Sequence, residues 1–327
     1  MTIILLFGLA IDINSSDVEQ LIRAGLEYAY TEQFDSASMY FDEIMSKYPQ
    51  NPSGYFMKAA LLQLKMMDAC RFEIENEYML LMRKAASRAQ EVLDDNEEDL
   101  WAEFYLANTY VYQAVYRAFR KDYFETFKLG VKGGRMMQAL VRRDSTFYDA
   151  YLSAGTFEYF WARASRYLPF FNLGGGDVEG AIEKLHAAAE KSLYSGPTAC
   201  NSLAFIYGEE GEYEKAVRII DSLLVQYPGS RTFMWNKAEL EFNNKNFWEA
   251  VELFAELHAR YDAMNDKNYA NLAQCRLYIG KCFVEMGDKA NARENLKEVI
   301  KYKEHWDEYP QIRGYSREAY SLLSRLL

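Results

Sequence analysis

Hydrophobic positions recur along the chain at the spacing of helices that bury one face, and the pattern repeats after 34 residues. The clearest unit is 197–230, in which two apolar runs at helical spacing flank Gly211 and end at Pro228. Residues 231–264 and 18–51 carry apolar residues at the same offsets. Each unit therefore predicts two antiparallel helices, and the second helix stops before a proline in two of the three units. Large residues at shared unit positions are Tyr28 and Tyr207, then Phe34, Tyr213 and Phe247, and finally Phe41 and Phe254.

This pattern resembles the tetratricopeptide repeat family, whose units place small residues where the two helices of a pair cross. The resemblance covers residues 18–327 and is strongest at 18–51 and 197–299. It implies an all-α fold, an α-α superhelix or solenoid of about seven helical pairs with a C-terminal capping helix. Large residues fill the space between successive pairs. The small residues expected at the crossings are Gly25 with Ala37, Ala204 with Ala216, and Ala238 with Ala250.

The resemblance also predicts how the chain is organised. Residues 1–17 form an apolar leader, and residues 18–327 form the solenoid. Regular repeats cover 18–51, 197–230, 231–264 and about 273–306, whereas 52–196 holds degenerate repeats with an inserted loop at 168–176. The degenerate part is similar to a group of bacterial tetratricopeptide repeat proteins. The residues that carry this likeness are Tyr148-Asp149-Ala150-Tyr151, Tyr159-Phe160, Leu168-Pro169 and Gly175-Gly176-Asp177.

Glycines in the degenerate part predict close helix packing. Gly130, Gly133 and Gly134 fall inside an expected helix, where glycine costs about 1 kcal/mol relative to alanine. We therefore expect a neighbouring helix to approach at these positions. Further along, Asp177 is expected to be the N-cap of the helix that follows the inserted loop.

The leader contains an unbroken apolar run from Ile3 to Ile11, which is too short to span a bilayer. With the small-x-small triplet Gly8-Leu9-Ala10 it resembles the end of a secretory signal, although a positively charged opening is missing. We therefore favour export, to the periplasm or outside the cell, over the cytoplasm. The alternative is a hydrophobic leader that folds against the first helix. No other segment predicts a membrane span.

Charge is distributed unevenly. Half of the 327 residues are hydrophobic, which excludes global disorder, and a net charge of −11 disfavours nucleic acid as a partner. Between residues 115 and 170, however, 10 basic and 5 acidic residues give +5. This stretch predicts a patch for an acidic peptide or a polyanionic glycan, or else ordinary pairing with Asp122, Glu125 and Glu158. The basic residues concerned are Arg117, Arg120, Lys121, Arg163 and Arg166.

The sequence contains no recognisable catalytic set. His186, His258 and His305 each lie alone in their segments, and the motifs of zinc proteases and serine hydrolases are missing. The four cysteines form no C-x-x-C, and Cys275 and Cys282 are expected to be buried apolar residues rather than metal ligands. We expect no enzymatic activity, no metal and no cofactor.

The resemblance finally predicts a binding surface, because the first helix of each pair lines the concave face in this family. We expect a non-enzymatic scaffold that binds a peptide or protein partner there through aromatic anchors. Three alternatives stay open: these aromatics are core residues, a small ligand or carbohydrate binds near 168–176, or the chain assembles with itself. The sequence leaves the oligomeric state undecided. The expected partner-binding residues are Phe56, Tyr105, Tyr112, Tyr159, Phe160, Phe205 and Trp235.

Overall fold

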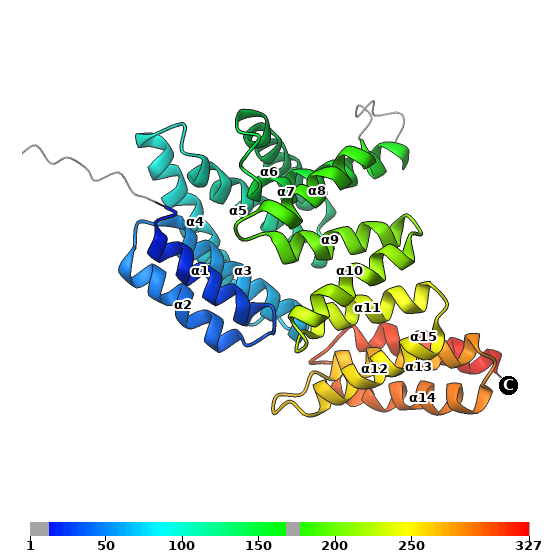
Figure 1. Ribbon diagram of the computed structural model, residues 1–327. Helices are drawn as coiled ribbons and strands as arrows, with labels where there is room; N and C mark the ends of the chain where they lie inside the picture. The colour runs from blue at the N-terminus through cyan, green and yellow to red at the C-terminus, as the bar shows by residue number, and fades with distance from the viewer. Residues whose placement is uncertain (1–12, 168–176, 327) are drawn as a thin grey trace, which may run out of the picture. The chain divides into compact units, whose positions relative to one another are not determined.

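A computed structural model describes residues 13–167 and 177–326, and the regular secondary structure of these residues is fifteen α-helices and one short 3-10 helix (Figure 1). The predicted all-α fold class is thereby confirmed. Most of the predicted leader and the whole inserted loop at 168–176 lie outside the described residues.

The chain divides into two compact units. Unit 1 takes the chain up to Ala29, Gln33–Gln63 and Ile74–Gly196. Unit 2 takes Pro197 to the C-terminus and also two short early segments, Tyr30–Glu32 and Leu64–Glu73. The turn after the first helix and the end of the third helix therefore belong to the C-terminal unit.

In unit 1 the most extensive packing is between helices that follow one another in the chain, as sequential pairs do in the predicted superhelix. Its helices are α1 (Ser16–Ala29), α2 (Phe34–Lys47), most of α3 (Pro52–Ala69), α4 (Glu75–Asp95), α5 (Leu100–Phe119), α6 (Tyr123–Arg143), α7 (Asp149–Tyr167) and α8 (Val178–Lys191).

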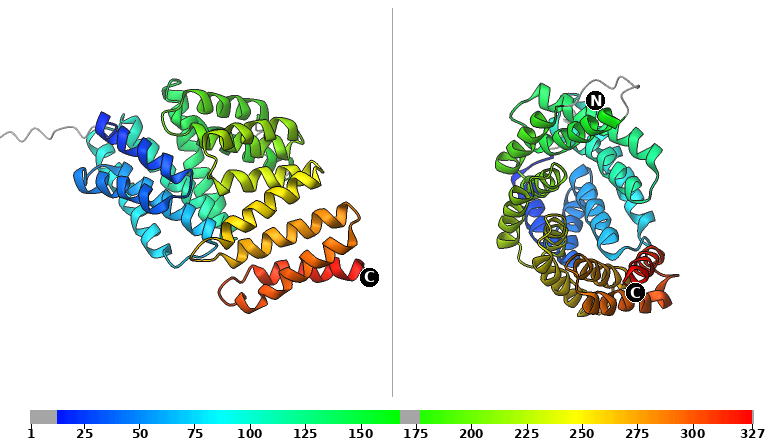
Figure 2. Two further views of the ribbon diagram at one scale, coloured as in Figure 1. Left: turned by 60° about the horizontal axis from the view of Figure 1, so that its bottom comes forward. Right: turned by 90° about the vertical axis from the view of Figure 1, so that its right-hand side faces the viewer.

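Unit 2 continues the same arrangement, and Figure 2 shows its later helices lying side by side in chain order. Its elements are α9 (Gly196–Glu209), α10 (Tyr213–Gln226), α11 (Arg231–Asn243), α12 (Phe247–Asp262), α13 (Tyr269–Glu285), α14 (Lys289–Lys301), the 3-10 helix η2 (Tyr302–His305) and α15 (Ile312–Arg325).

Small residues lie where paired helices cross. A Cβ on Gly280 of α13 would lie 2.8 Å from Leu296 Cδ2 on α14, so a larger residue there would require the Leu296 side chain to shift. Gly25 of α1 is equally crowded, but by the ring of Phe41, one turn beyond the predicted Ala37. The two predicted alanine pairs are almost completely buried: Ala204 with Ala216, and Ala238 with Ala250.

The glycines of α6 are explained by packing, as expected, at two of three positions. A Cβ on Gly133 would lie 2.9 Å from the carbonyl oxygen of Ala107 on α5, and one on Gly134 would overlap Phe157 on α7. Gly130 is different, because a Cβ there would meet only Ala114 Cβ at 3.8 Å, an ordinary contact. Close packing is therefore confirmed for Gly133 and Gly134 and does not account for Gly130.

Six of the turns between paired helices contain one residue with positive φ. Gly211 and Gly287 hold this position with φ of 80° and 76°. The other four are Glu32, Cys70, Lys121 and Lys245, with φ of 52°, 55°, 61° and 64°. The left-handed conformation costs a residue with a Cβ about 1 kcal/mol, so glycine would be easier at all four. Their side chains therefore call for an explanation.

Candidate partner-binding surface

Three of the expected partner-binding residues meet in the core of unit 1. The ring centroid of Phe56 on α3 lies 5.6 Å from that of Tyr105 and 5.0 Å from that of Tyr112 on α5. Phe56 and Tyr105 are buried, and Tyr112 is half-buried. The prediction that Phe56 and Tyr105 are exposed to a partner is therefore wrong. This face of α5 is covered by the preceding helices, which the irregular spacing of the degenerate repeats concealed.

Tyr159 and Phe160 are adjacent on α7 but have different surroundings. Tyr159 is completely buried, and its hydroxyl accepts a hydrogen bond of 2.9 Å from Nη1 of Arg163. Phe160 keeps 50% of its surface exposed. Consecutive helical residues point about 100° apart, so the two side chains can have different surroundings. Of this pair, Phe160 alone has the exposure that contact with a partner requires.

In unit 2, Trp235 on α11 is half-buried against its own repeat. Its Nε1 donates a hydrogen bond of 3.0 Å to the hydroxyl of Tyr261, and its ring lies 5.3 Å from that of Phe254. Phe205 on α9 has 49% of its surface exposed. A role in partner binding stays a prediction for Tyr112, Phe160, Phe205 and Trp235.

The predicted basic residues of unit 1 are partly paired with nearby acids. Nη1 of Arg117 lies 3.8 Å from Asp122, and Nη1 of Arg120 lies 3.9 Å from Glu75. Lys121 is exposed in the turn between α5 and α6. The pairing expected as an alternative is thus present at Asp122; the other two acids pair with lysines, Glu125 with Lys128 and Glu158 with Lys184. Arg163 bonds to Tyr159, and the side chain of Arg166 lies outside the described residues.

Large apolar side chains are exposed at the end of the α5–α6 hairpin. Val115 and Phe119 close α5 with 46% and 42% exposure, and Tyr123, Phe124 and Phe127 open α6 with 71%, 76% and 55%. We call these five residues together with Phe160 the hairpin patch.

Phe160 on α7 belongs with this hairpin because of how α5 and α7 align. Oγ of Ser153 on α7 donates a hydrogen bond of 3.1 Å to Oδ1 of Asn108 on α5. Phe160 and Val115 each follow these residues by seven positions, about two turns, and α5 and α7 run in the same direction. Both therefore project from the same face at the same end. On the α6 side, Phe127 stacks on Trp161 of α7 with ring centroids 6.2 Å apart.

The sequence analysis named Phe160 but not the α6 residues of the hairpin patch, of which Tyr123 and Phe127 continue the buried stripe of that helix. The buried residues of that helix begin only at Gly133 and continue through Met137 and Leu140. Tyr123 and Phe127 extend the same helical spacing toward the N-terminus. Periodicity identifies the face of a helix, whereas exposure depends on how far the neighbouring helices reach.

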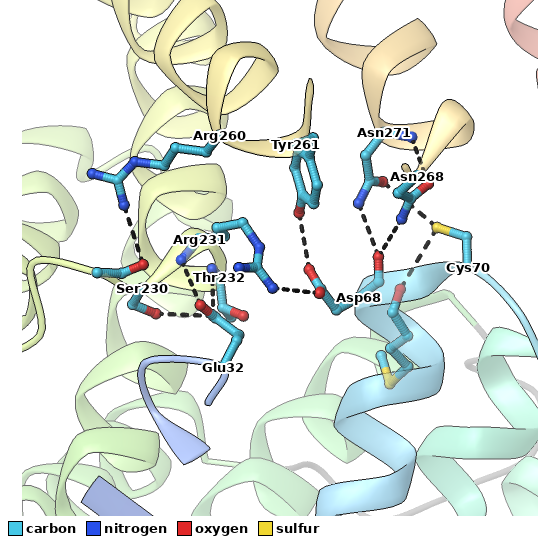
Figure 3. Close-up of polar contacts among 12 residues, drawn as sticks. Glu32, Asp68, Cys70, Ser230, Arg231, Thr232, Arg260, Tyr261, Asn268 and Asn271 are labelled. Carbon is cyan, nitrogen blue, oxygen red and sulfur yellow. Dashed lines mark hydrogen bonds and ion pairs between the residues drawn. The ribbon is translucent and has the colours of Figure 1, made fainter. Parts of the chain in front are cut away.

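A second functional candidate is a polar network in unit 2, shown in Figure 3. Its first centre is Glu32, which is 8% exposed. The carboxylate accepts hydrogen bonds from the backbone N–H of Arg231 at 2.9 Å, the backbone N–H of Thr232 at 3.0 Å and the hydroxyl of Ser230 at 3.2 Å. These groups form the N-terminus of α11, where unpaired N–H groups and the helix dipole favour an anion.

The second centre of the network is Asp68, in the last turn of α3. Its carboxylate accepts from Nη2 of Arg231 at 2.6 Å and from the hydroxyl of Tyr261 at 3.0 Å. Its carbonyl oxygen accepts from the side-chain amides of Asn268 at 2.6 Å and Asn271 at 2.9 Å. Burial lowers the pKa of Arg231, but the charges of Asp68 and Glu32 outweigh it and raise the pKa. We call Glu32, Asp68 and these partners the polar clasp.

Groups that could hold a metal ion and reactive thiols would be further candidate sites among the described residues. Residues 13–167 and 177–326 contain no group of three or more His, Cys, Asp or Glu side chains placed to hold a metal ion. Cys275 and Cys282 are buried, as expected, and burial raises the pKa of both thiols, that of Cys282 to about 12. Within the same residues, no helix combines the length and apolar character needed to cross a bilayer.

Comparisons with known proteins identify the repeat. The model of the tetratricopeptide repeat matches residues 202–230 and 274–302, which cover most of α9–α10 and α13–α14. Among curated proteins, none matches the chain.

Several solved structures are similar in fold. One is a signal transduction ATPase with numerous domains from Pyrococcus horikoshii, which has a tetratricopeptide repeat sensor. It has 16% sequence identity and a TM-score of 0.50, and the match covers 96% of this chain and 50% of that one. A tetratricopeptide repeat protein from Parabacteroides merdae has 15% sequence identity and a TM-score of 0.41. The match covers 93% of this chain and 98% of that one. A tetratricopeptide repeat protein from Thermus thermophilus has 16% sequence identity and a TM-score of 0.43, and the match covers 69% of this chain and 99% of that one. The chain therefore contains two tetratricopeptide repeats, at 202–230 and 274–302, inside a sequential array of helix pairs.

Proposed function

We propose that this protein is a non-enzymatic scaffold that binds a protein partner through the hairpin patch. Tetratricopeptide repeat domains generally serve as protein-interaction scaffolds and are usually not catalytic, which supports the general class. The observation that carries the specific proposal is the exposure of six large apolar side chains at one end of α5, α6 and α7.

Exposed apolar side chains that lie singly need no explanation, but a contiguous set marks an interaction site. Phe124 and Tyr123 keep more than two thirds of their surface exposed although they stand beside each other. Aromatic side chains contribute much of the binding energy in protein interfaces because they bury a large area with few rotatable bonds. The patch thus has the composition of an anchor site.

Phe205 in unit 2 remains a separate candidate contact, because it is 49% exposed but no comparable cluster surrounds it among the described residues. The alternative of a carbohydrate or small-ligand site at 168–176 concerns residues outside those described, and no observation favours it.

Site-specific photo-crosslinking tests the proposal. A benzophenone side chain replaces Phe124 in the hairpin patch, and in a matched control it replaces Tyr320 on α15, which is 55% exposed. We expect discrete protein adducts from position 124 in cells of the source organism and none of the same species from position 320. The same adducts from both positions, or none from 124, would show that the patch is not the binding surface.

A further inference from the structure

We infer that the occupant of the hairpin patch is an acidic amphipathic helix of a partner protein. This inference rests on the proposed function and specifies the chemistry of the partner. It comes from the basic side chains that surround the patch and from the spacing of its anchors.

The anchors are arranged along two antiparallel helices. Val115 and Phe119 are one helical turn apart on α5, and Tyr123 and Phe127 are one turn apart on α6. Rows of apolar residues at this spacing match the i, i+4 spacing of a third helix laid along them. An extended peptide, whose side chains alternate between two faces, would use only half of its residues against such a surface.

Basic side chains stand around the anchors. The segment from Val115 to Lys128 contains four of them, at Arg117, Arg120, Lys121 and Lys128, against two acids, Asp122 and Glu125. Among the described residues, Lys121 makes no ion pair and is exposed in the turn that joins α5 to α6. This is the basic part of a chain whose net charge is −11.

The existing pairs of these basic groups are weak. Arg117 and Arg120 lie 3.8 and 3.9 Å from their acidic partners, which is longer than a hydrogen bond. The side chain of Lys128 is 63% exposed in its pair with Glu125. Exposed pairs of this kind add little stability, so the cations can exchange them for carboxylates of a partner at small cost. A partner with Asp and Glu beside its apolar anchors fits both properties of the surface.

An anionic membrane surface is the main competitor, since it also combines apolar and negative groups. A membrane is an extended anionic surface that would face much of a chain whose net charge is −11, whereas a single helix meets only the locally basic segment 115–128. A second copy of this chain is another possible occupant. The observations favour the acidic helix, and the experiment separates all three.

The test is a fluorescence anisotropy titration of the full chain with defined probes. The first probe is a set of labelled 18-residue helical peptides with Leu and Phe at i, i+4 and i+7 and Glu at the remaining positions. The second set has Lys in place of Glu. Vesicles of phosphatidylcholine with roughly 30% phosphatidylserine, the third probe, are examined by co-sedimentation.

We expect Glu peptides to bind roughly tenfold or more tightly than Lys peptides, and more weakly at high salt. The double change Phe124→Ser with Phe127→Ser should reduce affinity at least roughly tenfold. Lys121→Glu should reduce it roughly two- to tenfold. Matched controls in unit 2, Tyr320→Ser and the exposed Lys289→Glu, should leave it unchanged. All five positions changed in these four variants are at the surface, and circular dichroism with thermal melting checks that each variant is folded.

Equal binding of Lys peptides, or vesicle binding that Phe124→Ser with Phe127→Ser abolishes, would overturn the inference. A dimer of the wild type in light scattering that the same double change converts to a monomer would also overturn the inference. If no Glu peptide binds but photo-crosslinking from position 124 still captures a protein, the acidic helix is wrong and the scaffold function stands.

Discussion

The carboxylate of Glu32, in the turn after α1, accepts a 2.9 Å hydrogen bond from the backbone N–H of Arg231, the first residue of α11 and 199 positions later in the chain. Ser230 is the local N-cap of α11 and accepts from the N–H of Phe233. Glu32 accepts from the next two N–H groups, Arg231 and Thr232, which have no partner within the helix. The N-terminus of α11 is therefore completed by a residue from the first repeat.

This contact explains a backbone anomaly. Glu32 holds φ of 52° at the unit position where Gly211 and Gly287 stand in other repeats. Glycine at 32 would remove the conformational cost of about 1 kcal/mol but would also remove the carboxylate. We conclude that the capping contact outweighs this cost.

Replacing Glu32 by Gln should lower the free energy of unfolding by about 1 to 3 kcal/mol, because a charge-assisted acceptor of three buried donors becomes a neutral amide. Glu32→Gly should lower it as well, even though glycine suits the backbone. Urea denaturation followed by circular dichroism measures both.

The matched control is Lys245→Gly, because Lys245 holds φ of 64° at the same position in the turn between α11 and α12. Without a capping contact to lose, this change should stabilise the protein by about 0.5 to 1 kcal/mol. Stabilisation by Glu32→Gly of the same size would mean that the carboxylate contributes nothing.

Asp68 and Arg231 should be energetically coupled. Their side chains are only 8% and 14% exposed, so Asp68→Asn leaves a guanidinium without its counter-charge and should cost about 2 to 4 kcal/mol (Figure 3). A double-mutant cycle with Arg231→Gln should give a coupling energy of about 1 to 3 kcal/mol. The exposed pair Glu214–Arg218 provides the comparison cycle, with an expected coupling below about 0.5 kcal/mol. Equal coupling in both cycles would argue against the role of burial.

His258 should make unit 2 sensitive to mild acid. Burial and the adjacent Arg276 lower the pKa of this imidazole, and Nε of Arg276 donates a 3.3 Å hydrogen bond to its Nε2. The unfolded state therefore binds the proton more readily, so stability falls as pH drops below about 6.5 toward the lower folded pKa. His258→Gln keeps an acceptor and should lose less stability between pH 7.5 and 5.5. An identical loss in the variant would exclude His258 as the cause.

Thiol reactivity should follow burial. Burial raises the pKa of Cys70 to about 11 and that of Cys282 to about 12. At pH 8 the thiolate fraction of Cys70 should be roughly a hundredfold below that of an ordinary cysteine, and its alkylation should accelerate about tenfold per pH unit. Iodoacetamide labelling with peptide mass spectrometry measures this, with glutathione as the reference thiol. Rapid labelling of Cys282 in the folded protein would contradict its burial.

Much of the fold was predictable because it is local and periodic. The 34-residue spacing predicted the helices α9 to α12. Gly133 and Gly134 predicted close helix packing, because glycine is unfavourable inside a helix unless a neighbour needs the space. The capping of α11 by Glu32 was not predictable, since no local pattern links residues so distant in the chain. The one available signal was a glutamate at a unit position where Gly211 and Gly287 stand.

The binding surface was predictable only in part. Phe160 is half exposed, and its role in partner binding stays a prediction, whereas Phe56, Tyr105 and Tyr159 are buried. A helical pattern shows which side chains share a face but not which face a neighbour covers. The exposed aromatic residues that open α6 therefore looked like core.

The central claim is that two sets of side chains have separate roles, the hairpin patch in partner binding and the polar clasp in stability. The most direct test compares three chains, the wild type, Phe124→Ser with Phe127→Ser, and Glu32→Gln, for peptide affinity at 20 °C as well as for the midpoint of urea unfolding. We predict that the patch variant loses at least roughly tenfold in affinity with an unchanged midpoint. The clasp variant should show a lower midpoint and unchanged affinity. Loss of affinity in both variants, or in neither, would contradict the account.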